Sequence, residues 1–115
     1  MNMDAKKFYD EQIQFLVNHD VNGLIDQHYC ADADLISLVQ DPLVISGASA
    51  LKEFFTSYLE ALGDLEVIST DKFVSTDDSI FFEATVKSNL GVVKVFDAFV
   101  MKEDKIFRHF SGLLG

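Results

Sequence analysis

Apolar residues recur at every third or fourth position through the first half of the chain, a spacing typical of amphipathic helices. One such stripe predicts a first helix over residues 3–18. A second, shorter stripe follows Asp20, whose side chain can cap a helix that begins there. The most regular stripe covers residues 51–62 and predicts a third helix, with Ser46 or Ser49 as its cap.

Turn signals surround the third helix. Gly63 can end it, because glycine readily adopts the left-handed backbone conformation found after many helices. Before the helix, residues 35–38 and 43–45 read as two short strands. The Gln-Asp-Pro sequence at residues 40–42 can form the turn that joins them.

The second half of the chain changes from helical to strand periodicity. Val, Ile, Phe and Thr are abundant, and short turn-like stretches with Asp, Asn or Gly interrupt them. The four predicted strands cover residues 65–75, 79–88, 92–102 and 105–114. Helices followed by strands predict a single α+β domain over residues 1–115, with the helices packed on one face of a curved, mostly antiparallel sheet.

Charge and composition narrow the class of protein. Nineteen acidic and nine basic residues give a net charge of −10, which disfavours binding to nucleic acid or to anionic membranes. No apolar run is long enough to cross a membrane and no secretory signal is recognisable, so we expect a cytoplasmic protein. The single cysteine, Cys30, and the absence of metal-ligand spacing around the histidines predict no disulfide, no metal and no cofactor.

Aromatic residues are unusually frequent. The chain has 11 Phe and three Tyr but no Trp. Phenylalanine has a large apolar surface and no polar group, so it can fill a core or line an apolar cavity equally well. Both interpretations are open for any one of these rings.

Several short stretches stand in an order that is typical of one family. They are NHDVNGL at 18–24, HYCADAD at 28–34, SGASALKEFF at 46–55, DAFV at 97–100 and KIFRHF at 105–110. In this order and spacing the chain resembles the nuclear-transport-factor-2-like superfamily, which includes ketosteroid isomerase and the SnoaL-like polyketide cyclases. Together the stretches cover nearly the whole chain, and they are specific to a fold rather than to a reaction.

The resemblance implies a cone-shaped, cystatin-like fold in which three N-terminal helices close a hollow sheet around a ligand pocket. It also implies a homodimer formed through the outer face of the sheet. A sheet covered on one face must have a polar or partnered second face, and several predicted outward positions are apolar. These positions are Ile68, Val74, Phe81, Phe96 and Val100.

Asp97 is the first candidate for chemistry. Strand alternation places it in a row that is otherwise apolar, together with Phe99. Burial among apolar groups should raise the pKa of this carboxyl, which suits a general acid or a neutral hydrogen-bond donor. The resemblance places Asp97 at the oxyanion-hole aspartate of ketosteroid isomerase. The alternative is an aspartate near a sheet edge that bonds to a lysine or a backbone amide.

His109 is the natural partner of Asp97, and the resemblance matches it to an active-site histidine of the SnoaL-like cyclases. A simple two-residue turn at residues 103–104 would pair Asp97 with Phe110 and point His109 away from Asp97. A longer turn or a bulge would put both side chains on one face. The resemblance favours the second arrangement, whereas a lone histidine in a strand is more often a surface or interface residue.

Six further residues are candidates to line a pocket around this pair. Gln12 interrupts the apolar stripe of the first helix, where the resemblance places the oxyanion-hole tyrosine of ketosteroid isomerase, and its amide could orient a carbonyl group. Gln12 could equally mark the edge of the stripe, and the two tyrosines could be ordinary core residues. The predicted ligand-binding residues are Gln12, Tyr9, Phe55, Tyr58, Phe99 and Ser111.

At two positions the chain departs from its relatives, and both departures weaken the case for a specific reaction. Gapless counting puts Leu38 where ketosteroid isomerase has its catalytic base, and Ser111 stands where SnoaL-like cyclases tend to carry an acidic residue. We therefore predict a small-molecule-binding protein with an apolar, aromatic-lined pocket. Such a pocket could catalyse proton transfer on a carbonyl compound, as isomerases, cyclases and dehydratases do. The alternative is a non-catalytic dimeric module that recognises a protein partner.

Overall fold

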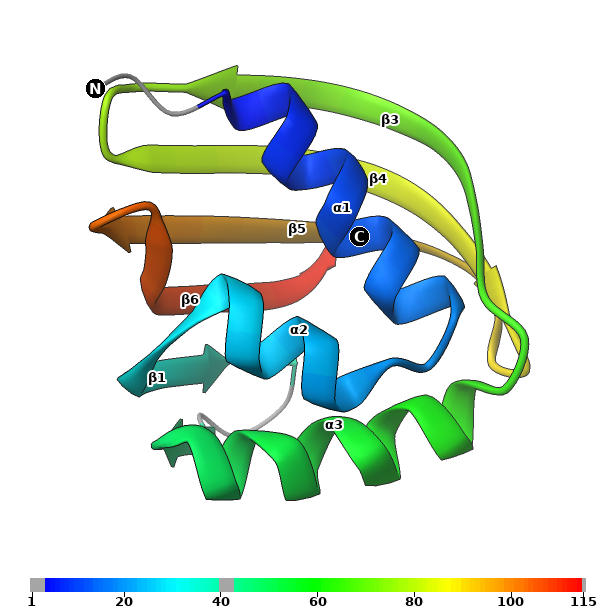
Figure 1. Cartoon of the computed structure of the whole chain (residues 1–115). Coiled ribbons are helices and arrows are strands. Elements are labelled where there is room, and N and C mark those ends of the chain that lie inside the picture. The colour runs from blue at the N-terminus through cyan, green and yellow to red at the C-terminus, as the bar shows by residue number, and fades with distance from the viewer. Residues whose placement is uncertain (1–3, 40–42, 115) are drawn as a thin grey trace.

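The computed structural model describes residues 4–39 and 43–114, and it has the α+β architecture that the sequence predicts (Figure 1). The elements in chain order are α1 (Ala5–Val17), α2 (Val21–His28), β1 (Tyr29–Ser37), β2 (Leu43–Ser46), α3 (Ala48–Leu62), β3 (Glu66–Ser75), β4 (Ser79–Ser88), β5 (Gly91–Lys102) and β6 (Lys105–Leu114). The predicted turn at residues 40–42 lies outside the described residues.

The strands form one mixed sheet in the order β2-β1-β6-β5-β4-β3. Among the strands that the structure describes, only β1 and β6 pair in parallel, and the other neighbouring pairs are antiparallel. Figure 1 shows β3 and β4 bending toward α3, while α1 and α2 lie in front of the sheet. Two irregularities in the β3–β4 register account for part of this bend, because an extra residue in one strand increases local curvature.

The strands of the second half match their predicted bounds to within one residue. The first strand does not, since β1 begins at Tyr29 rather than at residue 35. Its early part contains Cys30, Asp32 and two alanines, which have low strand propensity. Pairing with β6, interrupted by a register shift between Tyr29 and Asp34, extends the strand regardless of that propensity.

The sequence predicts residues for three helix ends, namely the start of α2 and the two ends of α3, and two of these three predictions are confirmed. Asp20 caps α2 by accepting a hydrogen bond from the backbone nitrogen of Gly23, as predicted. The prediction of Ser46 or Ser49 as the cap of α3 is wrong. The N-cap is Gly47, which has no side chain to contribute, and the Ser46 hydroxyl instead donates to Asp34 across 2.6 Å.

Gly63 ends α3, as predicted, in a conformation with φ of +65° that side-chain-bearing residues rarely adopt. A Cβ atom at this position would also collide with the side chain of Asn89. The backbone nitrogen of Asn89 donates to the carbonyl of Leu62 across 2.8 Å, so the helix end is held against the β4–β5 turn.

The β5–β6 hairpin decides which face of the sheet His109 occupies. Glu103 and Asp104 both have positive φ and form the two-residue turn between paired Lys102 and Lys105. The register then shifts by one residue between Val100 and Met101, so that His109 lies opposite Phe99. The bulge therefore puts His109 on the same face as Asp97, and the arrangement favoured by the resemblance is confirmed.

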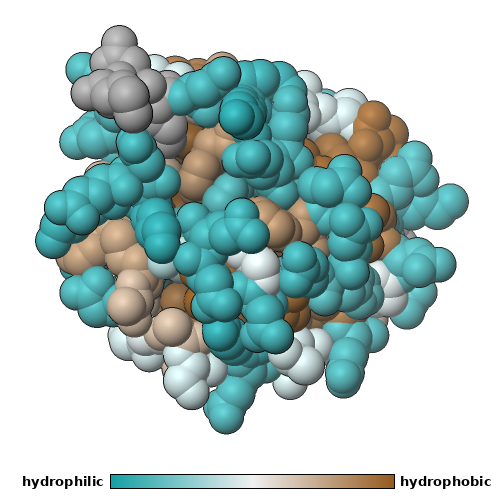
Figure 2. Space-filling view, viewed as in Figure 1, coloured by the Kyte–Doolittle hydropathy of each residue, from teal (hydrophilic) through white to brown (hydrophobic). Residues whose placement is uncertain are grey.

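The two faces of the sheet differ in what covers them. The inner face packs on the helices and shares one buried core with them, whereas no other element covers the outer face within the described residues. The predicted outward residues Ile68, Val74 and Val100 are 49%, 49% and 39% exposed. Phe81 and Phe96 are half-buried. The side of the molecule that carries the helices is largely hydrophilic, with scattered apolar patches (Figure 2).

Candidate functional site

A cavity of about 230 Å³ lies between the helices and the inner face of the sheet. Its walls are mostly leucine, valine and phenylalanine side chains, with a few polar groups among them. Two larger depressions, one between α3 and the start of α2 and one between α3 and β2, are more open to solvent. All eight residues that the sequence singles out line the same cavity. They are Tyr9, Gln12, Phe55, Tyr58, Asp97, Phe99, His109 and Ser111.

Asp97 and His109 form a hydrogen-bonded pair in the wall of this cavity. The Nε2 atom of His109 and the Oδ1 atom of Asp97 are 2.6 Å apart, and the side chains are 6% and 17% exposed. Burial raises the pKa of the Asp97 carboxyl, and the contact with His109 opposes that rise. Asp97 is the more exposed member of the pair, so it is the one better placed to meet a ligand.

A buried hydrogen-bond chain begins on the other side of His109. Its Nδ1 atom lies 2.8 Å from the hydroxyl oxygen of Tyr29, the first residue of β1. The ring of Phe99 packs edge-on against the His109 ring, with the ring centroids 4.7 Å apart. The imidazole therefore has a polar partner at each nitrogen and an aromatic neighbour beside it.

The chain continues from Tyr29 into the helices. Gln12 donates through Nε2 to the Tyr29 hydroxyl at 3.1 Å, and the Oε1 atom of Gln12 lies 2.7 Å from Nδ1 of His28. His28 stacks on Phe8, and its Nε2 atom lies 3.5 Å from a carboxylate oxygen of Glu11. Burial lowers the pKa of His28, while the exposed Glu11 acts in the opposite direction.

Sequence reasoning missed Tyr29 and His28 as site residues. His28 occupies an inward position of α2, and Tyr29 directly follows it at the start of β1. Both are nearly inaccessible, and a polar side chain buried to that degree needs a polar partner. The missing signal is therefore a pair of polar residues at predicted core positions, adjacent to each other in the sequence.

The hydrogen bonds also change the interpretation of Gln12. Its amide is 2% exposed and both of its ends are engaged by protein groups. Its role in orienting a ligand carbonyl stays a prediction, whereas its contacts with Tyr29 and His28 are explicit in the structure. Gln12 thus belongs first to the polar chain behind the cavity.

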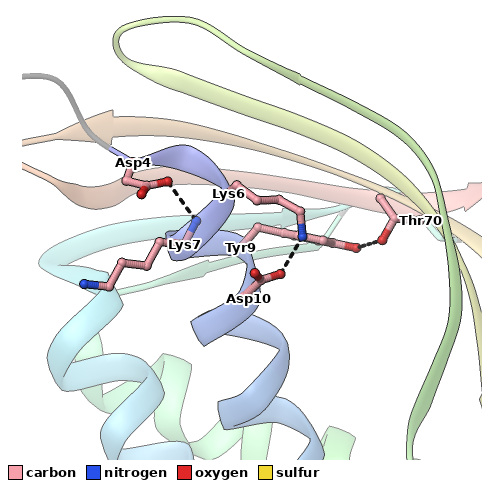
Figure 3. A network of polar contacts seen from close by, with 6 residues as sticks. All are labelled: Asp4, Lys6, Lys7, Tyr9, Asp10 and Thr70. Atoms are coloured by element: carbon pink, nitrogen blue, oxygen red, sulfur yellow. Dashed lines mark hydrogen bonds and ion pairs between the residues drawn. The ribbon is translucent and has the colours of Figure 1, made fainter.

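The two candidate tyrosines occupy different parts of the cavity. The Tyr9 hydroxyl oxygen lies 2.6 Å from the hydroxyl oxygen of Thr70 in β3, and the Lys6 ammonium lies over the Tyr9 ring (Figure 3). Burial raises the pKa of Tyr9. Tyr58 is 43% exposed and stacks on Phe54 with ring centroids 5.6 Å apart. Of the two tyrosines, Tyr58 is therefore the one that combines contact with the cavity and access from solvent.

Metal chemistry has no ready-made site in the part of the chain that the structure describes. No group of three or more His, Cys, Asp or Glu side chains gathers there in a way that could hold an ion.

No helix among residues 4–39 and 43–114 is long and apolar enough to cross a membrane.

Comparison with known proteins identifies the fold. No family model matches the chain, and no curated protein matches it in sequence. Among solved structures, an NTF2-like protein from Anabaena variabilis is similar, with a TM-score of 0.79 and 20% identity over 100% of this chain and 95% of that one. A Shewanella putrefaciens protein described as a SnoaL-like polyketide cyclase has a TM-score of 0.82 at 8% identity, covering 96% and 80% of the two chains.

A third similar structure is that of SalBIII, an epoxide hydrolase/cyclase-like enzyme described with a role in pyran ring formation in the polyether salinomycin. It has a TM-score of 0.78 at 15% identity, over 96% of this chain and 90% of that one. Identities this low establish the fold alone. The resemblance to nuclear-transport-factor-2-like and SnoaL-like proteins is thus confirmed at the level of the fold.

Proposed function

We propose that this protein binds a small, largely apolar carbonyl compound in the inner cavity and that Asp97 moves a proton on it. The observation that carries the proposal is the Asp97–His109 hydrogen bond of 2.6 Å in the wall of an otherwise apolar cavity. Strongly perturbed carboxyls in apolar clefts are characteristic of proton-transfer sites. Neighbours described as a polyketide cyclase and a cyclase-like enzyme support a pocket for small molecules.

The cavity limits the size and the polarity of the ligand. Its volume of about 230 Å³ lies below the range of about 300–1,000 Å³ that is usual for drug-sized ligands. In our proposal the helices close the curved sheet into a hollow cone, and aromatic rings form its walls without filling it. The ligand is then compact, for example a molecule with one or two rings and few polar atoms.

Proton transfer would use the side chains nearest the Asp97 carboxyl. Ser111 is the cross-strand partner of Asp97 and lines the same cavity, so its hydroxyl can donate to the carbonyl oxygen of the ligand. The Asp97 carboxylate takes a proton from the carbon next to the carbonyl, and the electron pair of that C–H bond moves onto the oxygen. Return of the proton to the same or another carbon completes an exchange or an isomerisation. A carboxylate with a raised pKa is a stronger base than an exposed one.

Deuterium exchange tests this proposal without a known natural substrate. Cyclohexanone is incubated with the protein in D2O, and deuterium incorporation next to the carbonyl is followed by NMR. We expect the protein to accelerate the exchange and Asp97→Asn to reduce the acceleration by about 100-fold or more, the usual effect of losing a general base. Asp77→Asn, at an exposed turn, is the matched control and should retain the parent rate.

A second candidate function rests on the outer face of the sheet. One row of cross-strand neighbours is apolar on all six strands, which is unusual for a face that must meet water. We propose that a second copy of the chain covers this row, which gives a homodimer. The same face would serve the alternative, non-catalytic function of recognising a partner. The row consists of Val44, Ile36, Phe110, Ala98, Phe81 and Val74.

A further inference from the structure

The hydrogen-bond chain behind the cavity has a direction, which follows from what each group can donate. The Oε1 atom of Gln12 can only accept, so the 2.7 Å contact with His28 requires a proton on Nδ1 of His28. The Nε2 atom of Gln12 can only donate, so the Tyr29 oxygen accepts from it at 3.1 Å. The single proton of the Tyr29 hydroxyl then remains to be placed.

The nearest acceptor for that proton is Nδ1 of His109, 2.8 Å away. If His109 carried a proton on Nδ1 instead, the Tyr29 oxygen would receive two donors and its own proton would point into a buried region. Tyr29 is 2% exposed, so such an unpaired proton would be costly. In the described part of the chain, every buried side-chain nitrogen and oxygen has a hydrogen-bond partner.

We propose that Gln12 and Tyr29 are positioning residues that hold His109 as the neutral imidazole with its proton on Nε2, directed at Asp97. The importance of this tautomer for proton transfer rests on the function proposed above. The tautomer itself depends only on the hydrogen bonds within the protein.

This arrangement determines what Asp97 faces. The titratable groups that contact His109 are Asp97 from β5 and Tyr29 from β1, while Tyr9 from α1 and Tyr58 from α3 line the same cavity. With His109 neutral, Asp97 receives one hydrogen bond from an uncharged ring instead of an ion pair with an imidazolium. A carboxylate without a cationic partner remains a better proton acceptor. Gln12 and Tyr29 thereby act on Asp97 through His109, without touching the ligand.

Nitrogen-15 NMR of the histidine rings reads the tautomer directly in the parent protein. At pH 7 we expect the His109 ring to have a protonated Nε2 and an unprotonated Nδ1. A protonated Nδ1 with a bare Nε2 would mean that the chain runs in the opposite direction, with Asp97 donating to His109, and would overturn the proposal. An imidazolium at pH 7 would overturn it as well.

Gln12→Glu tests whether the chain causes this state. The substitution preserves the shape of the side chain but replaces the amide donor by a carboxylate that accepts from Tyr29. Tyr29 must then accept from His109, and we expect Nδ1 of His109 to become protonated at pH 7. Gln14→Glu adds the same charge on an exposed position of α1 and should leave the His109 signals as in the parent. Unchanged His109 signals in folded Gln12→Glu protein would refute the role of Gln12.

The parent spectrum remains decisive if Gln12→Glu fails to fold, because it needs no substitution. Failure of this proposal is also distinguishable from failure of the proposed function. The tautomer is measured without any ligand, whereas the exchange of cyclohexanone protons measures turnover. A neutral Nε2-protonated ring with no exchange would leave the positioning intact and reject the chemistry. Exchange with the opposite tautomer would do the reverse.

Discussion

The two faces of the sheet depart in opposite ways from the usual rule that apolar residues are buried and polar residues are exposed. On the inner face, the polar side chains of Asp97 and His109 lie among apolar residues and are mostly buried. On the outer face, apolar side chains remain open to solvent, with Val44 60% exposed and Val74 49% exposed. Strand alternation makes this contrast local, because Asp97 stands between an outward Phe96 and an outward Ala98.

This contrast indicates which residues of a small domain are informative about its function. An exposed leucine or a buried valine says little, since both are common, whereas buried polar groups and contiguous exposed apolar groups are informative. The inner face keeps its polar groups by linking them in a hydrogen-bonded chain. The apolar side chains of the outer face have no comparable protein neighbours within the described residues, and this is why we propose that a second copy covers them.

The largest expected effect comes from placing a charge in the middle of the outer row. Ala98→Glu puts a carboxylate between the outward rings of Phe81 and Phe110 and should weaken self-association by about 100-fold or more, since an unpaired charge in an apolar interface is poorly tolerated. Sedimentation over a concentration series measures the effect. Lys102→Glu, at the exposed end of β5, is the control and should leave association near the parent value.

A parent protein that is monomeric at every concentration would remove the proposed use of the outer face. A dimer that Ala98→Glu leaves intact would mean that the copies associate elsewhere. Neither result would affect the inner cavity, so this experiment tests the outer face alone.

An intermediate effect is expected at Gly63, which positions the end of α3 beside the cavity. Gly63→Ala requires a strained positive φ and displaces Asn89, and together these should lower the free energy of unfolding by about 1–3 kcal/mol. Urea denaturation measures the change. Gly91→Ala is a useful comparison because its φ is also positive but no atom lies within 4 Å of the added Cβ. A loss at Gly63 no larger than that at Gly91 would show that the Asn89 contact contributes nothing.

The smallest expected effect concerns the stability cost of the Asp97 charge. Because burial raises its pKa in the folded state above the ordinary value of 3.8, the folded protein is penalised once the carboxyl ionises. Parent stability relative to Asp97→Asn should therefore be greatest below about pH 3 and should fall as the pH rises through the folded-state pKa. At pH 7, where the buried carboxyl is ionised, we expect Asp97→Asn to be the more stable of the two proteins.

Thermal unfolding of both proteins between pH 3 and pH 8 checks this prediction. A variant that is less stable than the parent at pH 7 would mean that the His109 contact more than offsets the burial of the charge. That outcome would contradict the description of Asp97 as a base whose buried charge lowers the stability of the fold.

Much of the fold could be read from the sequence because local signals and tertiary contacts agree there. The stripe over residues 51–62 and the strands of the second half have clear periods, and Asp20 and Gly63 have the chemistry of helix ends. β1 was predicted too short because its start depends on pairing with the distant β6. The predicted cap of α3 is wrong because the Ser46 hydroxyl donates to Asp34, a partner that no local pattern reveals.

The candidate site shows the same division. The position of Asp97 in an apolar row followed from alternation alone, whereas the side occupied by His109 depended on a one-residue bulge. Tyr29 was missed because its partners, Gln12 and His109, are 17 and 80 residues away in the chain. Sequence patterns find residues on a face, and only the folded chain tells which of them bond to one another.

A crystal structure of the protein grown with cyclohexanone tests whether the inner cavity is a ligand site. We predict one ketone in the inner cavity, with its oxygen within hydrogen-bond distance of Ser111 and the carbon beside the carbonyl next to the Asp97 carboxyl. A cavity filled by the protein's own aromatic rings, with the ketone absent or bound only at the surface, would contradict it.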